Sequence, residues 1–260
     1  MLYNLHTHTT RCNHAIGEDR EYVEAAIKKG IKVLGFSDHC PQFFKKKGYY
    51  SHFRMKPDIA YDYVESVKSL KKEYQNDIKI LLGFEAEYYP ETFEALTALT
   101  KELDMDYMIM GEHLIGNEYD EDTVYEGKRT GDDFLIKYVN QVIEGLETGV
   151  YTYIAHPDIP FHKGNPLVYS EQMTRLCTRA KELDIPLETN MLGIYDKKCY
   201  PCEAFWEIAG KVGNKAVIGF DAHTPEFFGR TDLYNQCFDL LKKNGLEPMS
   251  FEEINIRKPY

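Results

Sequence analysis

Residues of the types that bind metal ions recur in six short segments of this chain. Each segment follows an apolar run that is typical of a β-strand. Seven of the nine histidines lie in these segments, and only His52 and His162 lie outside them. Imidazole and carboxylate groups recurring in this way predict a site that holds several metal ions. The residues are His6, His8, His14, His39, Glu85, His113, His156, Asp221 and His223.

Two of these segments contain ligand pairs separated by one residue. His6 and His8 form the first pair, and Asp221 and His223 form the second. Because side chains alternate with period two along a strand, both members of such a pair point to the same side. A lone His-x-His pair is more often two surface histidines, but the histidine at position 14 and the second pair favour a metal site. Imidazole and carboxylate without thiolate leave zinc, manganese and iron open.

The elements that position these residues alternate between strand and helix patterns along the whole chain. One helix, for example, carries Tyr22, Val23, Ala26 and Ile27 on one face and ends at Gly30. Repeated strand-then-helix order predicts a parallel sheet, because parallel neighbours need a crossover connection. The expected strands are residues 2–5, 31–36, 78–84, 107–110, 151–155, 186–189 and 216–220. The later helices are expected to begin at or near Asp58, Pro90, Asp132, Ser170, Pro201 and Thr231.

Seven such units predict a single α/β domain over residues 1–260, folded as a distorted (β/α)7 barrel similar to a TIM barrel. A doubly wound open sheet is the alternative. In parallel barrels the chemistry lies at the C-terminal ends of the strands. Here the expected strands end next to polar residues, which places the metal site at that end of the barrel.

Composition narrows the class of protein further. The net charge is −11 and the mean hydropathy is −0.48, with acidic residues spread throughout the 260 residues. This charge disfavours a nucleic acid partner. No apolar run approaches the roughly 18–20 residues that span a bilayer. The six cysteines are sparse and follow no apolar leader, so we expect a cytoplasmic protein with reduced thiols and no membrane partner.

An ordered set of motifs resembles a known family. The motifs are His-Thr-His at 6–8 with Cys-Asn-His at 12–14, GFSDH at 35–39, LGFEAEY at 82–88, LETNMLGIYDKKCYP at 187–201 and DAHTPE at 221–226. Together they resemble the PHP (polymerase and histidinol phosphatase) metal-dependent phosphoesterases, and most closely the histidinol-phosphate phosphatase branch. The resemblance implies a distorted (β/α)7 barrel, in agreement with the count of alternations.

The resemblance also implies a ligand set for three divalent transition-metal ions, which would be zinc, manganese or iron. The first ion would be held by His6, His8, Glu85 and Asp221, the second by Glu85, His113 and His156, and the third by His14, His39 and His223. Glu85 would bridge two ions, since it lies two residues after Gly83 as in the family motif. Glu87 is the alternative bridge. The catalytic residues would be Glu85, Asp221 and Asp38. Of these, Asp38 would orient a ligand imidazole or donate a proton.

A filled site of this kind is positively charged and suits a small anion. We therefore expect hydrolysis of a phosphate monoester, with an alcohol and inorganic phosphate as products. The resemblance implies L-histidinol phosphate as the substrate, in histidine biosynthesis. Basic candidates for phosphate binding are Arg11, Arg54, Arg129, Lys163 and Arg230. Acidic candidates for binding the amine and imidazole are Glu112, Asp158 and Glu188.

Two other functions stay open on the sequence. One is a PHP phosphoesterase for a phosphotyrosyl protein, a nucleotide or a sugar phosphate, because the segment PDIPFHKG after His156 lacks the arginine often found there. Gly111-Glu112 before His113 and Phe220 before Asp221 also depart from the family pattern. The other is a metal-binding module without catalysis, which the complete ligand set disfavours. The oligomeric state is not indicated.

Overall fold

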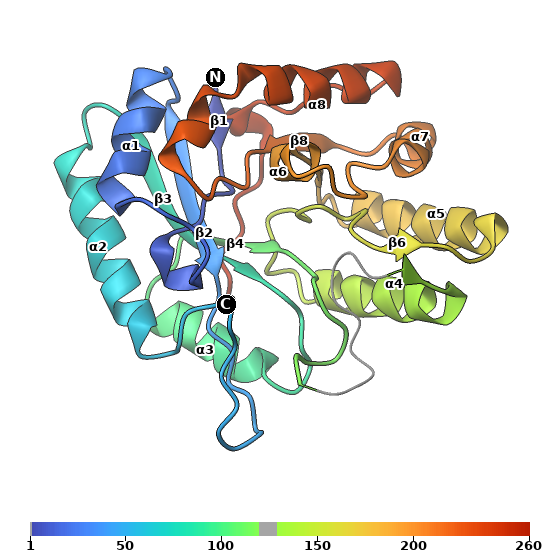
Figure 1. Cartoon of the computed structure of the whole chain (residues 1–260), viewed down its shortest axis with the longest axis horizontal. Helices are drawn as coiled ribbons and strands as arrows, with labels where there is room; N and C mark the ends of the chain where they lie inside the picture. The colour runs from blue at the N-terminus through green and yellow to red at the C-terminus, as the bar shows by residue number, and fades with distance from the viewer. Residues whose placement is uncertain (1, 120–128) are drawn as a thin grey trace.

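The computed structural model describes residues 2–119 and 129–260 as a curled parallel β-sheet covered by helices (Figure 1). Four strands pair in the order β1-β2-β3-β4, all parallel. The register pairs Val33 with Lys79 and His39 with Glu85, so two expected ligands lie side by side on neighbouring strands. The strands are β1 (Tyr3–Asn4), β2 (Val33–His39), β3 (Lys79–Ala86) and β4 (Tyr107–Met110).

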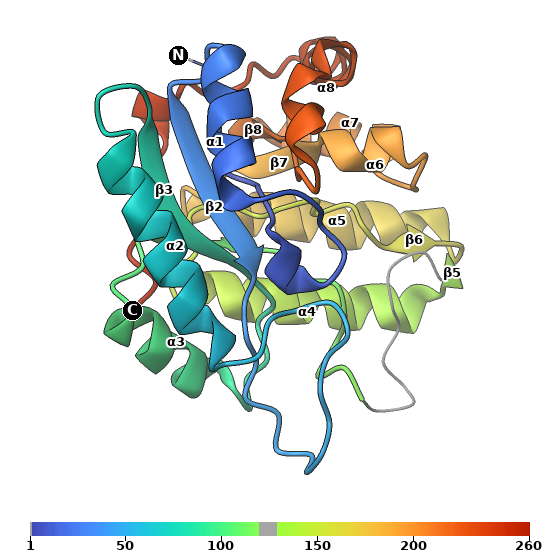
Figure 2. The same cartoon turned by 60° about the vertical axis from the view of Figure 1, so that its left-hand side comes forward.

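Two further strands form a second parallel pair. They are β7 (Leu187–Asn190) and β8 (Ala216–Gly219). Isolated parallel bridges connect Ile154 with both Met110 and Leu187, and another connects Thr7 with Ala222. The parallel sheet therefore curls, and the segment after β8 meets the segment after β1. A short pair that was not expected, β5 (Arg129–Thr130) with β6 (Phe161–His162), lies beside α4 and α5 in Figure 2.

The expected strand at residues 151–155 is not a regular strand, and this prediction was wrong. The segment still donates backbone hydrogen bonds to both sides, from Thr152 N to Met108 O and from Ile154 N to Pro186 O. The chain then turns sharply at His156, whose φ is 31°. The segment therefore joins β4 to β7 through isolated bridges at Ile154 and leaves the sheet after Ala155.

Helices follow the strands in the expected order and pack on the outside of the sheet (Figures 1 and 2). Starts differ from expectation by up to four residues, as at α5, which Asn165 caps through a bond from Leu167 N with Pro166 in the first turn. The short α6 was not expected. The helices are α1 (Asp19–Lys28), α2 (Ile59–Glu73), α3 (Phe93–Glu102), α4 (Asp132–Glu147), α5 (Pro166–Glu182), α6 (Met191–Tyr195), α7 (Glu203–Val212) and α8 (Thr231–Lys243).

The strands bury side chains on both faces, as parallel strands covered by helices do. Leu34 and Phe36 of β2 belong to a large core under the helices, whereas Val33 belongs to a smaller core inside the curl. Tyr107 lies in this inner core, and its hydroxyl donates to the carbonyl oxygens of Leu5 and Phe36. These two layers fix the strand ends, and therefore the residues that follow them.

In the described part of the chain, no helix is both long and apolar enough to cross a membrane. All six cysteines lie among the described residues, and each is a free thiol.

Candidate metal centre

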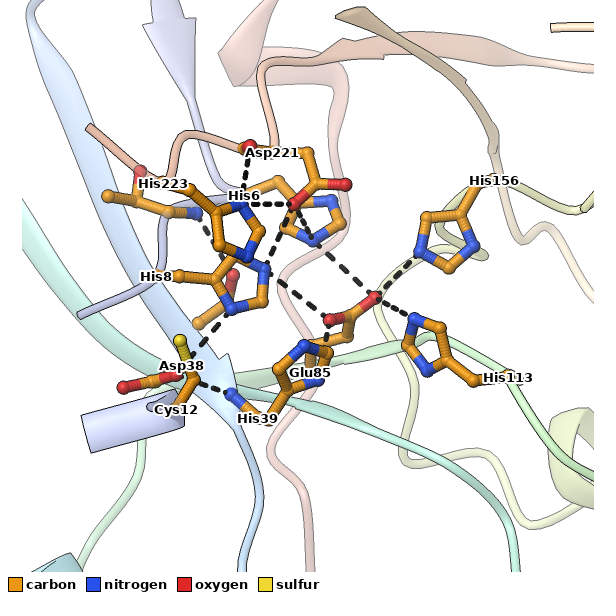
Figure 3. Close-up of polar contacts among 12 residues, drawn as sticks. His6, His8, Cys12, Asp38, His39, Glu85, His113, His156, Asp221 and His223 are labelled. Atoms are coloured by element: carbon orange, nitrogen blue, oxygen red, sulfur yellow. Dashed lines mark hydrogen bonds and ion pairs between the residues drawn. The ribbon is translucent and has the colours of Figure 1, made fainter. Parts of the chain in front are cut away.

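The nine residues expected to bind metal lie together at the C-terminal ends of the strands, and all of them except His14 are labelled in Figure 3. His39 and Glu85 lie in β2 and β3, and the others lie in the turns that follow the strands. The turns at His156 and Asp221 have positive φ values of 31° and 55°. Side chains rarely adopt this backbone conformation, and strain of this kind is concentrated at functional sites.

Glu85 occupies the middle of the cluster, and five imidazoles face its carboxylate (Figure 3). Its side chain is 1% exposed. Gly111 makes room for it, since a Cβ there would lie 2.0 Å from Glu85 Oε1. The distances to its nearer oxygen are 2.8 Å from His156 Nε2, 3.1 Å from His39 Nδ1, 3.5 Å from His6 Nε2, 3.5 Å from His8 Nε2 and 3.6 Å from His113 Nε2.

Asp221 lies beside Glu85 and faces the first His-x-His pair. Its Oδ1 lies 3.0 Å from His8 Nε2 and 3.5 Å from His6 Nε2. His223, from the same turn, reaches towards His14, and the two Nε2 atoms are 2.9 Å apart. Two imidazole nitrogens at this distance repel each other unless a proton or a metal ion lies between them. His14 and His223 therefore share either a proton or a metal ion.

A second set of contacts holds the ring nitrogens that point away from the centre. Glu188 contacts His6 Nδ1 at 3.0 Å, Glu87 contacts His113 Nδ1 at 2.8 Å, and Asp38 lies 3.5 Å from His8 Nδ1. Backbone carbonyls of Cys12 and Asp221 serve His14 and His223 in the same way, at 2.8 and 3.0 Å. Partners of this kind fix the tautomer and orientation of metal-binding imidazoles.

The chemistry of the cluster fits metal ions. Buried atoms without a hydrogen-bond partner include His6 Nε2, His8 Nε2, His39 Nδ1 and one oxygen each of Glu85 and Asp221. Such atoms are costly to leave unpaired, and all of them point into the cluster. Ligand atoms of His6, His8 and Asp221 lie close enough to hold one ion, as do those of His6, Glu85 and His156. The outer groups are His8, His39 and His223, and Cys12, His14 and His223.

Cys12 is a potential ligand that the sequence reasoning did not include. It also forms a group with His8 and Asp38 (Figure 3). Burial raises the pKa of its thiol, but hydrogen bonds with His14 and His8 outweigh burial. The pKa of Cys12 is therefore below its ordinary value. The Cys-x-His spacing of Cys12 and His14 is the sequence signal by which it could have been found.

Electrostatics favour the charged form of both carboxylates. Burial raises the pKa of Glu85, but His6, His113 and His39 outweigh it and hold the pKa well below its usual range. Asp221 behaves in the same way, with His6 as its strongest partner. Burial lowers the pKa of His223 to about 3, with His8 adding to the effect. Ionised carboxylates and a neutral imidazole are the forms that bind metal ions.

A cavity of about 400 Å³ opens onto the cluster. Its wall carries cations, Lys198 and Arg230, and carboxylates, Asp196 and Glu226. The aromatic residues of the wall are Phe53, Tyr195, Tyr200 and Phe227. The cavity therefore offers opposite charges and flat apolar surfaces next to the candidate ions.

Most of the basic candidates from the sequence lie elsewhere. Arg230 lines the cavity and pairs with Asp232, whereas Arg54 is buried and Arg11 pairs with Asp19 and Asp62. Lys163 lies over the ring of Phe161, and the side chain of Arg129 lies outside the described residues. Lys198 lines the cavity and was missed, because lysines in a turn are usually surface charges.

None of the three acidic candidates lines this cavity. Glu188 holds His6, Glu112 accepts from Tyr88 N and from the side chain of Gln141, and Asp158 accepts from Cys202 N. All three are buried and lie outside the cavity wall. Burial raises the pKa of Asp158 to about 7. Their positions at strand ends were predicted correctly, but the direction of a side chain depends on the local turn.

Comparisons with known proteins agree with this geometry. The family model of the PHP domain matches residues 4–192. A protein of Deinococcus radiodurans named "Probable histidinol-phosphatase" is 27% identical over 235 residues, which cover 86% of this chain and 87% of the relative. The histidinol-phosphatase of Bacillus subtilis is 30% identical over 95 residues, 35% of each chain.

A solved structure shares the fold over the whole chain. Histidinol phosphate phosphatase from Lactococcus lactis, in complex with zinc, L-histidinol and phosphate, has a TM-score of 0.75 and 18% identity, with 99% of each chain covered. At this identity the likeness shows the fold. The family model covers most of the chain, and it includes the segments that carry seven of the nine residues of the cluster. The chain therefore belongs to the PHP domain family.

Proposed function

We propose that this protein is a metal-dependent phosphoric monoester hydrolase that converts L-histidinol phosphate to L-histidinol and inorganic phosphate. The observation that carries the proposal is the cluster of seven imidazoles and two carboxylates beneath a cavity whose wall holds both cations and carboxylates. The choice of substrate is supported by relatives named as histidinol-phosphatases and by the Lactococcus lactis enzyme, which was solved with L-histidinol and phosphate bound.

The cluster would hold three divalent ions of zinc, manganese or iron. Its ligands would be the residues predicted from the sequence: His6, His8, His14, His39, Glu85, His113, His156, Asp221 and His223. Ions bound there would supply acidified water as nucleophile and would neutralise the phosphoryl oxygens and the leaving alkoxide. Glu85 is the proposed bridge because it faces imidazoles from both sides, whereas Glu87 lies behind His113 and contacts the remote nitrogen of that ring and Arg54.

Other residues of the chain orient these groups. Asp38 accepts from Thr9 Oγ1 at Oδ2 and from His39 N at Oδ1, and Oδ1 also lies 3.5 Å from His8 Nδ1. It therefore acts as an orienting residue rather than as a proton donor. In the cavity wall, Lys198 and Arg230 would contact the phosphate, while Asp196 and Glu226 would face the amine and the imidazole of the substrate. The aromatic residues of the wall would exclude water.

The same proposal includes a closed, distorted (β/α)7 barrel. The bridges of Ile154 with Met110 and Leu187, and of Thr7 with Ala222, join the two sheets on either side. Closure is supported by hydrogen bonds from His8 N to Ala222 O and from Ala222 N to His6 O. In a ring of this kind all strand ends converge on one site.

Steady-state kinetics with metal-replete enzyme test the substrate. The kcat/KM for L-histidinol phosphate should exceed that for p-nitrophenyl phosphate by about a hundredfold, equivalent to about 2.7 kcal/mol of transition-state binding. A small aromatic ester cannot use the carboxylates of the wall. Equal or inverted values would indicate a phosphoesterase for another substrate, and no turnover of any phosphate ester would indicate a metal-binding module without catalysis.

A further inference from the structure

Arg54 has an environment unlike that of the other candidate cations. Its side chain is 1% exposed, and it lies in the segment between β2 and α2. Its Nη2 lies 2.9 Å from Glu87 Oε1, its Nε donates to Glu118, and its Nη1 donates to Cys40 O at 3.0 Å. A buried charge with this many partners is not available to bind phosphate, so its role must be sought among these contacts.

The partners of Arg54 come from the three segments that follow β2, β3 and β4. Each of these strands contains one of the expected metal ligands or is followed by one. Cys40 follows His39 of β2, and Glu87 follows Glu85 of β3 by two residues. Glu118 lies in the segment after β4, five residues beyond His113. One guanidinium therefore ties together the ends of three neighbouring strands, where His39, Glu85 and His113 face one another.

Glu87 connects this guanidinium to the cluster. The same oxygen, Glu87 Oε1, contacts Arg54 Nη2 and His113 Nδ1, at 2.9 and 2.8 Å. A carboxylate fixed in this position accepts the Nδ1 proton of His113, which leaves Nε2 with its lone pair directed towards Glu85. Without Arg54, Glu87 would be free to turn and the tautomer of His113 would no longer be set.

Phe53 adds a packing contact on the other side. Its ring lies edge-on to His39 and His113, with centroids 5.5 and 6.2 Å away, and it lines the cavity. The guanidinium of Arg54 lies over this ring, at 4.5 Å from its centroid. Arg54 thus holds both the carboxylate behind His113 and the aromatic ring in front of it.

We propose that Arg54 is a positioning residue of the metal centre, which fixes His113 through Glu87 and through Phe53. The inference rests on the proposed metal-dependent function, and it concerns the ion held between Glu85, His113 and His156. Of the two carboxylates that bind the guanidinium, Glu87 also contacts His113, whereas Glu118 anchors Arg54 without touching His113. Their roles are therefore separable.

The test compares the variants Arg54→Gln, Arg54→Lys, Glu87→Gln and Glu118→Gln with the unmodified holoenzyme. Zinc-loaded protein is mixed with a chromophoric chelator, and the release rate of each ion is measured. We expect Arg54→Gln and Glu87→Gln to accelerate the release of one slow ion about tenfold or more, as loss of outer-shell partners does. In the double variant, Arg54→Gln with Glu87→Gln, release should be accelerated by less than the product of the two single effects, because both changes break the same contact through Glu87.

Glu118→Gln should lower the midpoint of chemical unfolding yet release its ions within about twofold of the unmodified rate. Arg54→Lys keeps the charge and should give a rate between those of Arg54→Gln and the unmodified protein. Arg20→Gln is the matched control, since Arg20 also binds a carboxylate, Glu73, but both side chains are exposed. Unchanged release in Arg54→Gln, or equal acceleration in Glu118→Gln, would overturn the proposal.

A measurement on metal-free protein separates this inference from the proposed function. Ring nitrogen shifts of His113 report its tautomer, and Arg54→Lys and Glu87→Gln should both increase the Nε2-protonated form. If the unmodified protein binds no zinc and hydrolyses no phosphate ester, the proposed function fails while the tautomer shift still supports the role of Arg54. An unchanged tautomer in both variants would reject that role.

Discussion

The candidate metal centre has two halves that are held in different ways. The inner half, His6, His8, Glu85, His113, His156 and Asp221, is almost fully buried. The outer half is His14, His39 and His223. His14 and His223 lie at its rim, and the side chain of His223 is 14% exposed, whereas that of His39 is 6% exposed. Carboxylates contact the remote nitrogens of His6 and His113 at hydrogen-bond distance, and Asp38 lies 3.5 Å from that of His8. Backbone carbonyls contact those of His14 and His223.

This difference indicates how firmly each half should bind its ions. A carboxylate behind an imidazole makes the ring a more basic ligand, and a neutral carbonyl does so less. The inner half also contains two carboxylates, Glu85 and Asp221, which face its imidazoles directly. The inner ions should therefore be permanent and the outer ion exchangeable, and about three ions per chain should be found by elemental analysis after saturation. At most one ion would contradict a trinuclear centre.

The largest effect is expected from the carboxylate in the middle of the inner half. Glu85→Gln removes a negative charge that faces five imidazoles, and kcat should fall by about two to three orders of magnitude. Glu87→Gln is the control two residues further along the chain, just after β3, and should reduce kcat much less. Reversed effects in steady-state assays would show that Glu87 is the bridge.

An intermediate effect is expected from the carboxylates behind the inner imidazoles. Glu188 contacts His6 Nδ1 with both oxygens. A Cβ on Gly219 would lie 1.6 Å from Glu188 Oε1, so the glycine leaves room for this carboxylate. Glu188→Gln should weaken zinc affinity or activity by about 10- to 100-fold. Competition with a chelator of known affinity measures this change. Unaltered affinity would remove the basis for distinguishing the two halves.

The smallest effect is expected from the outer half. A mild chelator should remove one ion first, and His223→Ala should abolish only this fast phase. Loss of that ion should lower the melting temperature by about 2–4 °C, equivalent to about 1 kcal/mol in a chain of this size. Complete removal of metal should lower it considerably more, since the inner carboxylates and imidazoles are buried. Equal shifts in calorimetry would mean that the halves bind alike.

The sequence by itself determined the residue types, the order of elements and the end of the sheet at which the site lies. Alternating strand and helix patterns require parallel strands, and parallel strands bring their C-terminal ends to one edge. Ligand-type residues after these strands therefore had to meet. For this reason the positions of His39 beside Glu85, and of Asp221 beside His6 and His8, agree with the expectation drawn from local patterns.

Only the tertiary structure decided which groups face the ions and which stand behind them. Glu85 and Glu87 have the same local pattern, yet Glu87 points to His113 Nδ1 and to Arg54, from a different segment. The segment 151–155 has the pattern of a strand but bends at His156 to direct that imidazole towards Glu85. Arg54 was a candidate for phosphate binding but is buried and paired with carboxylates. These choices depend on contacts between residues far apart in the chain, and the periodicity of one segment does not contain that information.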